Sequence, residues 1–107
     1  MDTTERYEAF LRNRISELIV QRGISEHRLS LELGKSGSYI RAITNNRALP
    51  SVKELFNIMD YFGVSPTKFF EGLDDDDSLR STLRKSLWRL DEETLKKVAM
   101  FIEWVEK

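Results

Sequence analysis

The sequence contains no cysteine, one histidine and two prolines among its 107 residues. The lack of cysteine excludes disulfides and thiolate metal sites, and a lone histidine, His27, argues against a histidine metal centre. No apolar run approaches the ~18 residues that a membrane-spanning helix needs. The N-terminus lacks the charged and then apolar pattern of a secretory signal. We therefore expect a cytoplasmic protein of bacterial or phage origin, with no metal, cofactor or membrane contact.

Apolar residues recur at helical spacing, and no segment alternates as a strand would. Ser51 and Glu54 form a capping-box pair that begins one helix. Ser65 and Pro66 begin another, with serine as the cap and proline at the first helical position. These signals predict an all-α fold whose first 72 residues form a five-helix bundle.

The segment from Ser25 to Ser51 is predicted to contain the second and third helices of this bundle. Ser25 can cap the second helix, and Gly34 can end it in a left-handed conformation. Ser36 is expected to cap the third helix. Two helices joined by a short turn that contains glycine are typical of the helix-turn-helix of DNA-binding proteins.

The charges around the third helix favour a polyanionic partner. Four basic residues and no acidic one lie between positions 35 and 53, although the formal charge of the whole chain is −1. Such a local patch attracts a phosphate backbone. From charge alone, a solvated basic face without a partner is the alternative. Joined to the turn, the patch makes double-stranded DNA the expected partner.

This segment resembles the helix-turn-helix of the Cro/phage-repressor class, the XRE family. The matching positions are Leu29, Gly34, Ser36, Tyr39, Ile40, Ile43, Asn45, Pro50 and Ser51. The resemblance covers roughly residues 5–72 and implies a lambda-repressor-like bundle. It also implies a transcriptional regulator, expected to be a repressor that binds a two-fold operator through the third helix. No catalytic motif accompanies it, so we expect no enzymatic activity.

The resemblance also implies which residues meet DNA. Outward side chains of the third helix would reach base edges, and flanking side chains would reach phosphates. Arg41 is the expected reader of guanine, with a phosphate contact as its alternative role. Tyr39 is expected to pack beside the second helix and to hydrogen-bond a phosphate. The predicted DNA-binding residues are Ser25, Arg28, Ser36, Gly37, Ser38, Tyr39, Arg41, Asn45, Arg47 and Lys53.

Three positions depart from the family pattern. Glu26 stands where glutamine is frequent and adds a carboxylate near the expected phosphate path. Gly37 stands where glutamine or arginine is frequent and can read no base, and Ser30 replaces the usual alanine. The departures leave Arg41 with most of the expected specificity.

The remainder of the chain reads as a linker and a helical tail. Residues 73–78 contain four adjacent aspartates, whose repulsion favours an extended segment, and the last of them is expected to cap the next helix. Residues 79–107 are predicted to form two helices, the second capped by Asp91. The apolar residues of this C-terminal helical extension are expected to form a dimer interface made of Leu87, Trp88, Leu95, Val98, Phe101, Ile102, Trp104 and Val105.

Several alternatives stay open for the tail and for the function. The tail could pack on its own bundle in place of joining two copies, because a two-helix hairpin is too small to be stable alone. The protein could be an antitoxin that represses its own operon and holds a toxin through the tail. It could also be a protein-interaction module with the same fold and weak DNA binding.

Overall fold

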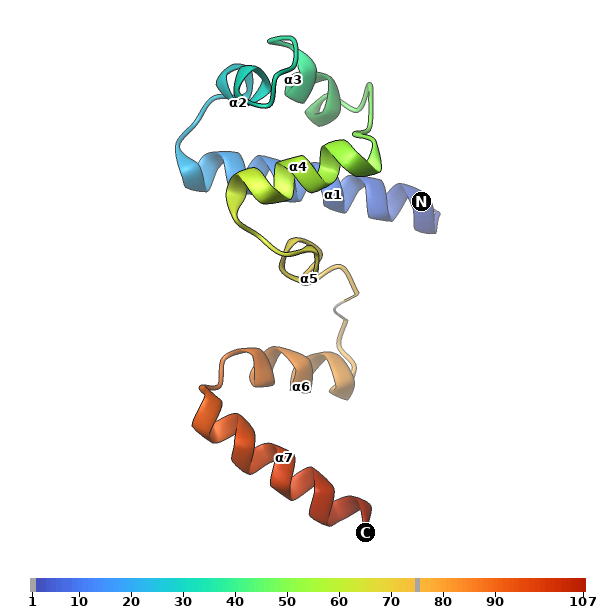
Figure 1. The fold of residues 1–107 in the computed structure, drawn as a ribbon. Coiled ribbons are helices and arrows are strands. Elements are labelled where there is room, and N and C mark those ends of the chain that lie inside the picture. Colours follow the sequence, from blue (N-terminus) through green and yellow to red (C-terminus); the bar gives the residue numbers. More distant parts are fainter. Residues whose placement is uncertain (1, 75) are drawn as a thin grey trace. The chain divides into compact units, whose positions relative to one another are not determined.

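The computed structural model describes residues 2–74 and 76–107. These residues form seven helices and, within those ranges, no strand, which confirms the predicted all-α fold class (Figure 1). The chain divides into two compact units, one up to Leu73 and one from Asp74 onward, and each is described by itself. Within the predicted acidic linker, Asp75 lies outside the described residues.

The first unit contains five helices, as the sequence predicts. They are α1 (Thr3–Arg22), α2 (Glu26–Glu32), α3 (Tyr39–Thr44), α4 (Val52–Phe62) and α5 (Pro66–Phe69). The capping box of α4 is confirmed, because Ser51 Oγ accepts from Glu54 N at 3.1 Å and the Glu54 side chain accepts from Ser51 N at 2.9 Å. Ser65 caps α5 with proline at its first position, also as predicted.

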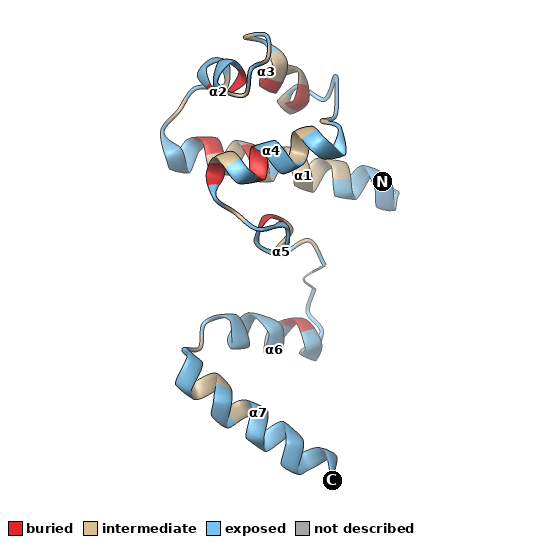
Figure 2. Ribbon diagram, in the orientation of Figure 1, coloured by how far each residue is buried: buried red, intermediate tan, exposed pale blue. Residues whose placement is uncertain are grey.

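The core of the first unit draws on all five helices. Figure 2 shows buried positions on each of them. The two inward residues of α3, Ile40 and Ile43, are 0% and 1% exposed. The core consists of Ile15, Ile19, Leu29, Ile40, Ile43, Ile58, Met59, Phe62 and Phe69. Ile40 and Ile43 thus fix this short helix on the rest of the bundle.

Two arginines of α1, Arg14 and Arg22, contact residues of α5 and α4. Arg14 Nε donates to the carbonyl oxygen of Phe69 at 2.8 Å, and its Nη2 donates to that of Glu71. The guanidinium of Arg22 lies 5.2 Å from the ring centroid of Phe62. The two bonds from Arg14 satisfy carbonyl oxygens at the C-terminal end of α5 and just beyond it.

Two predicted caps are wrong. Helix α3 begins at Tyr39 with Ser38 at the N-cap, and Ser36 contributes only its backbone oxygen, which accepts from Tyr39 N at 3.1 Å. The chain makes one more tight turn there before the helix starts. In the second unit Ser78, and not Asp77, caps the next helix, because Ser78 has the extended conformation of an N-cap and its side chain accepts from Ser81 N at 3.1 Å.

The second unit consists of α6 (Leu79–Trp88) and α7 (Glu92–Glu106). Asp91 caps α7 as predicted, since its carboxylate accepts from Thr94 N at 2.8 Å. The apolar side chains of α7 are half-buried or exposed, and Phe101 and Trp104 are 62% and 69% exposed. None of the described helices is long and apolar enough to cross a membrane.

Candidate nucleic-acid interface

Residues from Ser25 to Thr44 fold as two helices that pack against each other after a tight turn. Ser25 Oγ accepts a hydrogen bond from Arg28 N at 3.0 Å and so begins α2. Gly34 has a φ of +75°, a left-handed conformation that favours glycine, and it leads the chain out of α2. Figure 1 shows α2 and α3 lying next to each other above α1 and α4.

Ser30 joins the two helices through a buried hydroxyl. Its Oγ donates to the carbonyl oxygen of Glu26 at 2.8 Å and accepts from Ile40 N at 3.0 Å. The side chain is 0% exposed, so water cannot replace either bond. The second bond satisfies a backbone N–H in the first turn of α3, which would otherwise lack an intrahelical acceptor. Ser30 therefore fixes the start of α3 against α2.

The starts of the two helices together border an open hollow of about 600 Å³. The hollow is lined by Ser25, Glu26, His27, Gly37, Ser38 and Arg41. Four of these six are predicted DNA contacts, so the fold gathers them on one surface. The Arg41 side chain is 70% exposed, and Ser25 and Ser38 are exposed as well. A surface of this kind offers a guanidinium and two hydroxyls to one partner.

Gly37 lies against the ring of His27. A Cβ added to Gly37 would come within 2.4 Å of His27 Cε1 and 2.5 Å of Nδ1. Any larger residue would have to displace this exposed ring. Gly37 and Ser38, both predicted DNA contacts, precede α3, which begins at Tyr39, so neither lies within the third helix.

The carboxylate of Glu26 contacts two residues of α3. Its Oε1 lies 3.6 Å from Arg41 Nη1, and its Oε2 accepts a hydrogen bond from the hydroxyl of Thr44. The Glu26 side chain is 30% exposed, much less than that of Arg41. The acidic residue that departs from the family pattern is thus paired with two residues of α3.

This architecture is matched by a family model described as helix-turn-helix (HTH_3), which aligns with residues 15–69, just over half of the chain. This chain belongs to the XRE-type helix-turn-helix family. No curated protein and no solved structure gave a significant match. The aligned residues include all of α2, α3, α4 and α5 and all nine residues of the core. Membership makes the protein a DNA-binding transcriptional regulator.

In this XRE-type domain the Tyr39 hydroxyl already has an acceptor. It donates to Glu54 Oε1 at 2.8 Å, and Lys35 Nζ donates to Glu54 Oε2 at 2.8 Å. These bonds and the one from Ser51 N lower the pKa of Glu54 to about 2, while burial and Glu54 raise the pKa of Tyr39 above its ordinary value. A phenol has one proton to donate. In this arrangement Tyr39 cannot also donate to a phosphate, and Lys35 is neutralised.

The side chains predicted to grip the DNA backbone lie around this helix pair. Asn45 is the C-cap of α3, Arg47 lies in the loop that follows, and Lys53 lies in the first turn of α4; all three are exposed. Arg28 is 73% exposed, with its Nε 3.3 Å from Glu32 Oε1. No acidic residue lies between Arg47 and Lys53 in the sequence.

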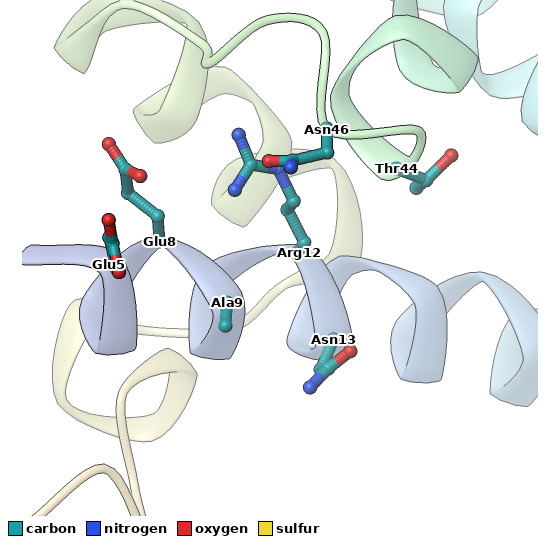
Figure 3. Close-up of a pocket in the computed structure, with 7 residues that line it drawn as sticks. All are labelled: Glu5, Glu8, Ala9, Arg12, Asn13, Thr44 and Asn46. Carbon is teal, nitrogen blue, oxygen red and sulfur yellow. The ribbon is translucent and has the colours of Figure 1, made fainter. Parts of the chain in front are cut away.

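The XRE-type domain also contains a support that sequence reasoning missed. Arg12 of α1 donates from Nε to the carbonyl oxygen of Ile43 at 2.9 Å and from Nη2 to that of Ala48 at 3.4 Å. Figure 3 shows Arg12 rising from α1 beside Asn46, which has a left-handed φ of +66°. The partners are 31 and 36 residues away, so no local pattern signals them. Arg12 fixes the C-terminal end of α3 as Ser30 fixes its start.

A second hollow lies beside Arg12. It is lined by Glu5, Glu8, Ala9, Arg12, Asn13, Thr44 and Asn46 (Figure 3). Two of these residues are acidic, and the guanidinium of Arg12 lies with them. Within the ranges that the structure describes, no group of three or more His, Cys, Asp or Glu side chains could hold a metal ion.

Proposed function

We propose that this regulator is a repressor that inserts α3 into the major groove of a two-fold operator. The observation that carries the proposal is the exposed Arg41 side chain, which lies with Ser25 and Ser38 around one hollow on the α2–α3 unit. An α-helix fits the major groove, and a guanidinium can grip guanine O6 and N7 there. A protein bound over a promoter excludes other proteins from that DNA.

The charges near α3 support contacts to the phosphate backbone on both sides of the groove. Arg47 and Lys53 are exposed and follow α3 in sequence. Two carboxylates of this domain, Glu26 and Glu54, each face a cation, Arg41 and Lys35 respectively. Their negative charge is therefore partly compensated where the DNA backbone would pass.

We propose that two copies bind the operator together, joined by their C-terminal helices. Half-sites for this class of reader lie about one helical turn apart, which a two-fold dimer matches. The aromatic rings of Phe101 and Trp104 lie 5.9 Å apart on α7 and are mostly exposed. Exposed aromatic clusters are enriched in protein interfaces.

A mobility-shift assay with the DNA upstream of the gene tests the reader role of Arg41. We expect specific binding to weaken about 5- to 150-fold in Arg41→Ala, the loss of one bidentate base contact of about 1–3 kcal/mol. Arg47→Ala should weaken specific and random DNA equally and lower the salt slope by about 0.9. Arg80→Ala, in α6, removes the same charge outside this domain and serves as the control.

Absence of any sequence-specific shift at low salt would contradict the proposal and favour the protein-interaction module. The exposed rings of Phe101 and Trp104 favour a second candidate, an antitoxin that holds a toxin through the tail. That candidate requires a complex with the product of an adjacent gene, which co-expression and size-exclusion chromatography would reveal.

A further inference from the structure

Glu26 connects the start of α2 with two residues of α3, Arg41 and Thr44. One carboxylate oxygen accepts a hydrogen bond from the Thr44 hydroxyl, and the other lies 3.6 Å from Arg41 Nη1. The same residue's backbone oxygen accepts from Ser30 Oγ at 2.8 Å. Since Thr44 and Ser30 hold Glu26 at separate atoms, its carboxylate has a defined place beside Arg41.

This contact leaves one edge of the Arg41 guanidinium for a partner. A guanidinium has five N–H donors arranged as a planar fork. When Nη1 faces Glu26, the edge formed by Nε and Nη2 points away from the carboxylate, and that edge suits a bidentate bond to guanine O6 and N7. Arg41 is otherwise a long side chain, 70% exposed, which would sample many rotamers.

The pair is too exposed to serve mainly for stability. Ion pairs in which one partner is largely solvated contribute little to the free energy of folding. An oriented side chain, by contrast, loses less entropy when it binds, and a carboxylate beside it repels phosphates. Both effects lower binding to random DNA relative to a site that offers guanine to Arg41.

We infer that Glu26 is the specificity-determining positioning residue of this interface. It orients Arg41 toward a guanine and opposes binding wherever that guanine is missing. The inference rests on the proposed DNA reading by α3. It accounts for a carboxylate at a position where the family often has glutamine, because the acid orients a neighbouring arginine in addition to repelling phosphates.

The test uses an operator selected from random DNA by the full-length wild-type protein. The measured quantity is the specificity ratio, the affinity for that operator divided by the affinity for the same site with its essential guanine replaced. We expect the ratio to fall about tenfold in Glu26→Gln, with a rise in affinity for random DNA. In an Arg41→Ala background Glu26→Gln should leave the ratio unchanged.

Two further variants separate positioning from charge. Thr44→Val keeps the charge of Glu26 but removes one of its anchors, and we expect a smaller fall in the ratio with no rise in affinity for random DNA. Glu17→Gln removes an acid from α1 that pairs with Arg14 and should leave the ratio unchanged. Circular dichroism of each variant verifies that the helices remain folded.

The possible outcomes distinguish this inference from the proposed function. If the wild-type protein selects no sequence at all, the proposed function and the inference both fail. If it selects an operator, but Glu26→Gln strengthens binding to every sequence equally, the specificity ratio is unchanged. Glu26 would then weaken binding to all DNA sequences alike through its charge. Only the inference would be overturned.

Discussion

The hydroxyl of Ser30 lies between two helices and makes a hydrogen bond to each. It donates to Glu26 O at 2.8 Å, accepts from Ile40 N at 3.0 Å and is inaccessible to water. Alanine is frequent at this position in the family, and the sequence pattern treated the serine as a mild change. The structure gives it a specific task, because it supplies the acceptor for a buried N–H at the start of α3.

We expect Ser30→Ala to lower the free energy of unfolding by about 1–3 kcal/mol, the cost of leaving a buried donor without an acceptor. Urea unfolding followed by circular dichroism measures the change. Ser36→Ala, at an exposed position, should alter it by less than about 0.5 kcal/mol. Equal effects of the two substitutions would contradict the role given to Ser30.

At the scale of elements, α3 depends on its neighbours for its existence. It spans six residues, and isolated helices shorter than about 12–15 residues are marginal in water. Ile40 and Ile43 bury it in the core, while Ser30 and Arg12 bond its backbone at the two ends. A helix held in this way keeps a fixed orientation on the surface, which a groove reader requires.

Glu54 links the start of α3 with the start of α4. Its carboxylate accepts from Lys35, Tyr39 and Ser51, and these bonds lower its pKa from 4.5 to about 2. A carboxyl group whose pKa is lower in the folded state stabilises the fold above its unfolded pKa, and this contribution is lost as the pH falls through the folded pKa.

We therefore expect Glu54→Gln to be less stable than the wild type at pH 7. The difference should shrink as the pH falls from about 4.5 to about 2, where the wild-type carboxylate also becomes protonated. Urea unfolding over a pH series measures it. Glu93→Gln, in the first turn of α7, changes the net charge equally and is the control. Equal stability of Glu54→Gln and wild type at pH 7 would contradict this linkage.

At the scale of the whole molecule, the two units differ in how they bury apolar residues. The first unit has a core of nine buried apolar side chains, whereas α7 of the second has none that is fully buried. The exposed side chains there include Phe101, Ile102, Trp104 and Val105. Large exposed apolar patches mark interaction sites in soluble proteins.

We expect the chain to sediment as a dimer, with about twice its mass of 12.6 kDa. Replacing Phe101 and Trp104 together by serine should shift it to a monomer while leaving its helical circular dichroism intact. Val20→Ser, at a 79% exposed apolar position of α1, is the matched control. A wild-type monomer, or an unchanged mass in the double variant, would contradict dimerisation through α7.

The sequence by itself determined the helices of the bundle and most of their ends. Caps such as Ser25, Ser51 and Asp91 bond to backbone atoms three residues away, so a local pattern is enough to predict them. The caps of α3 and α6 were mistaken by one or two residues, because several polar residues compete there and the turn geometry decides between them.

The tertiary structure alone decided which polar side chains meet around α3. Glu26 is paired with Thr44 and Glu54 with Tyr39, which are 18 and 15 residues apart. Arg12 bonds to Ile43 across 31 residues. Such contacts depend on how the helices pack, and no residue pattern along the chain encodes the distance between two side chains. The sequence thus named Arg41 as the expected reader, and the packing of α2 on α3 supplied the carboxylate beside it.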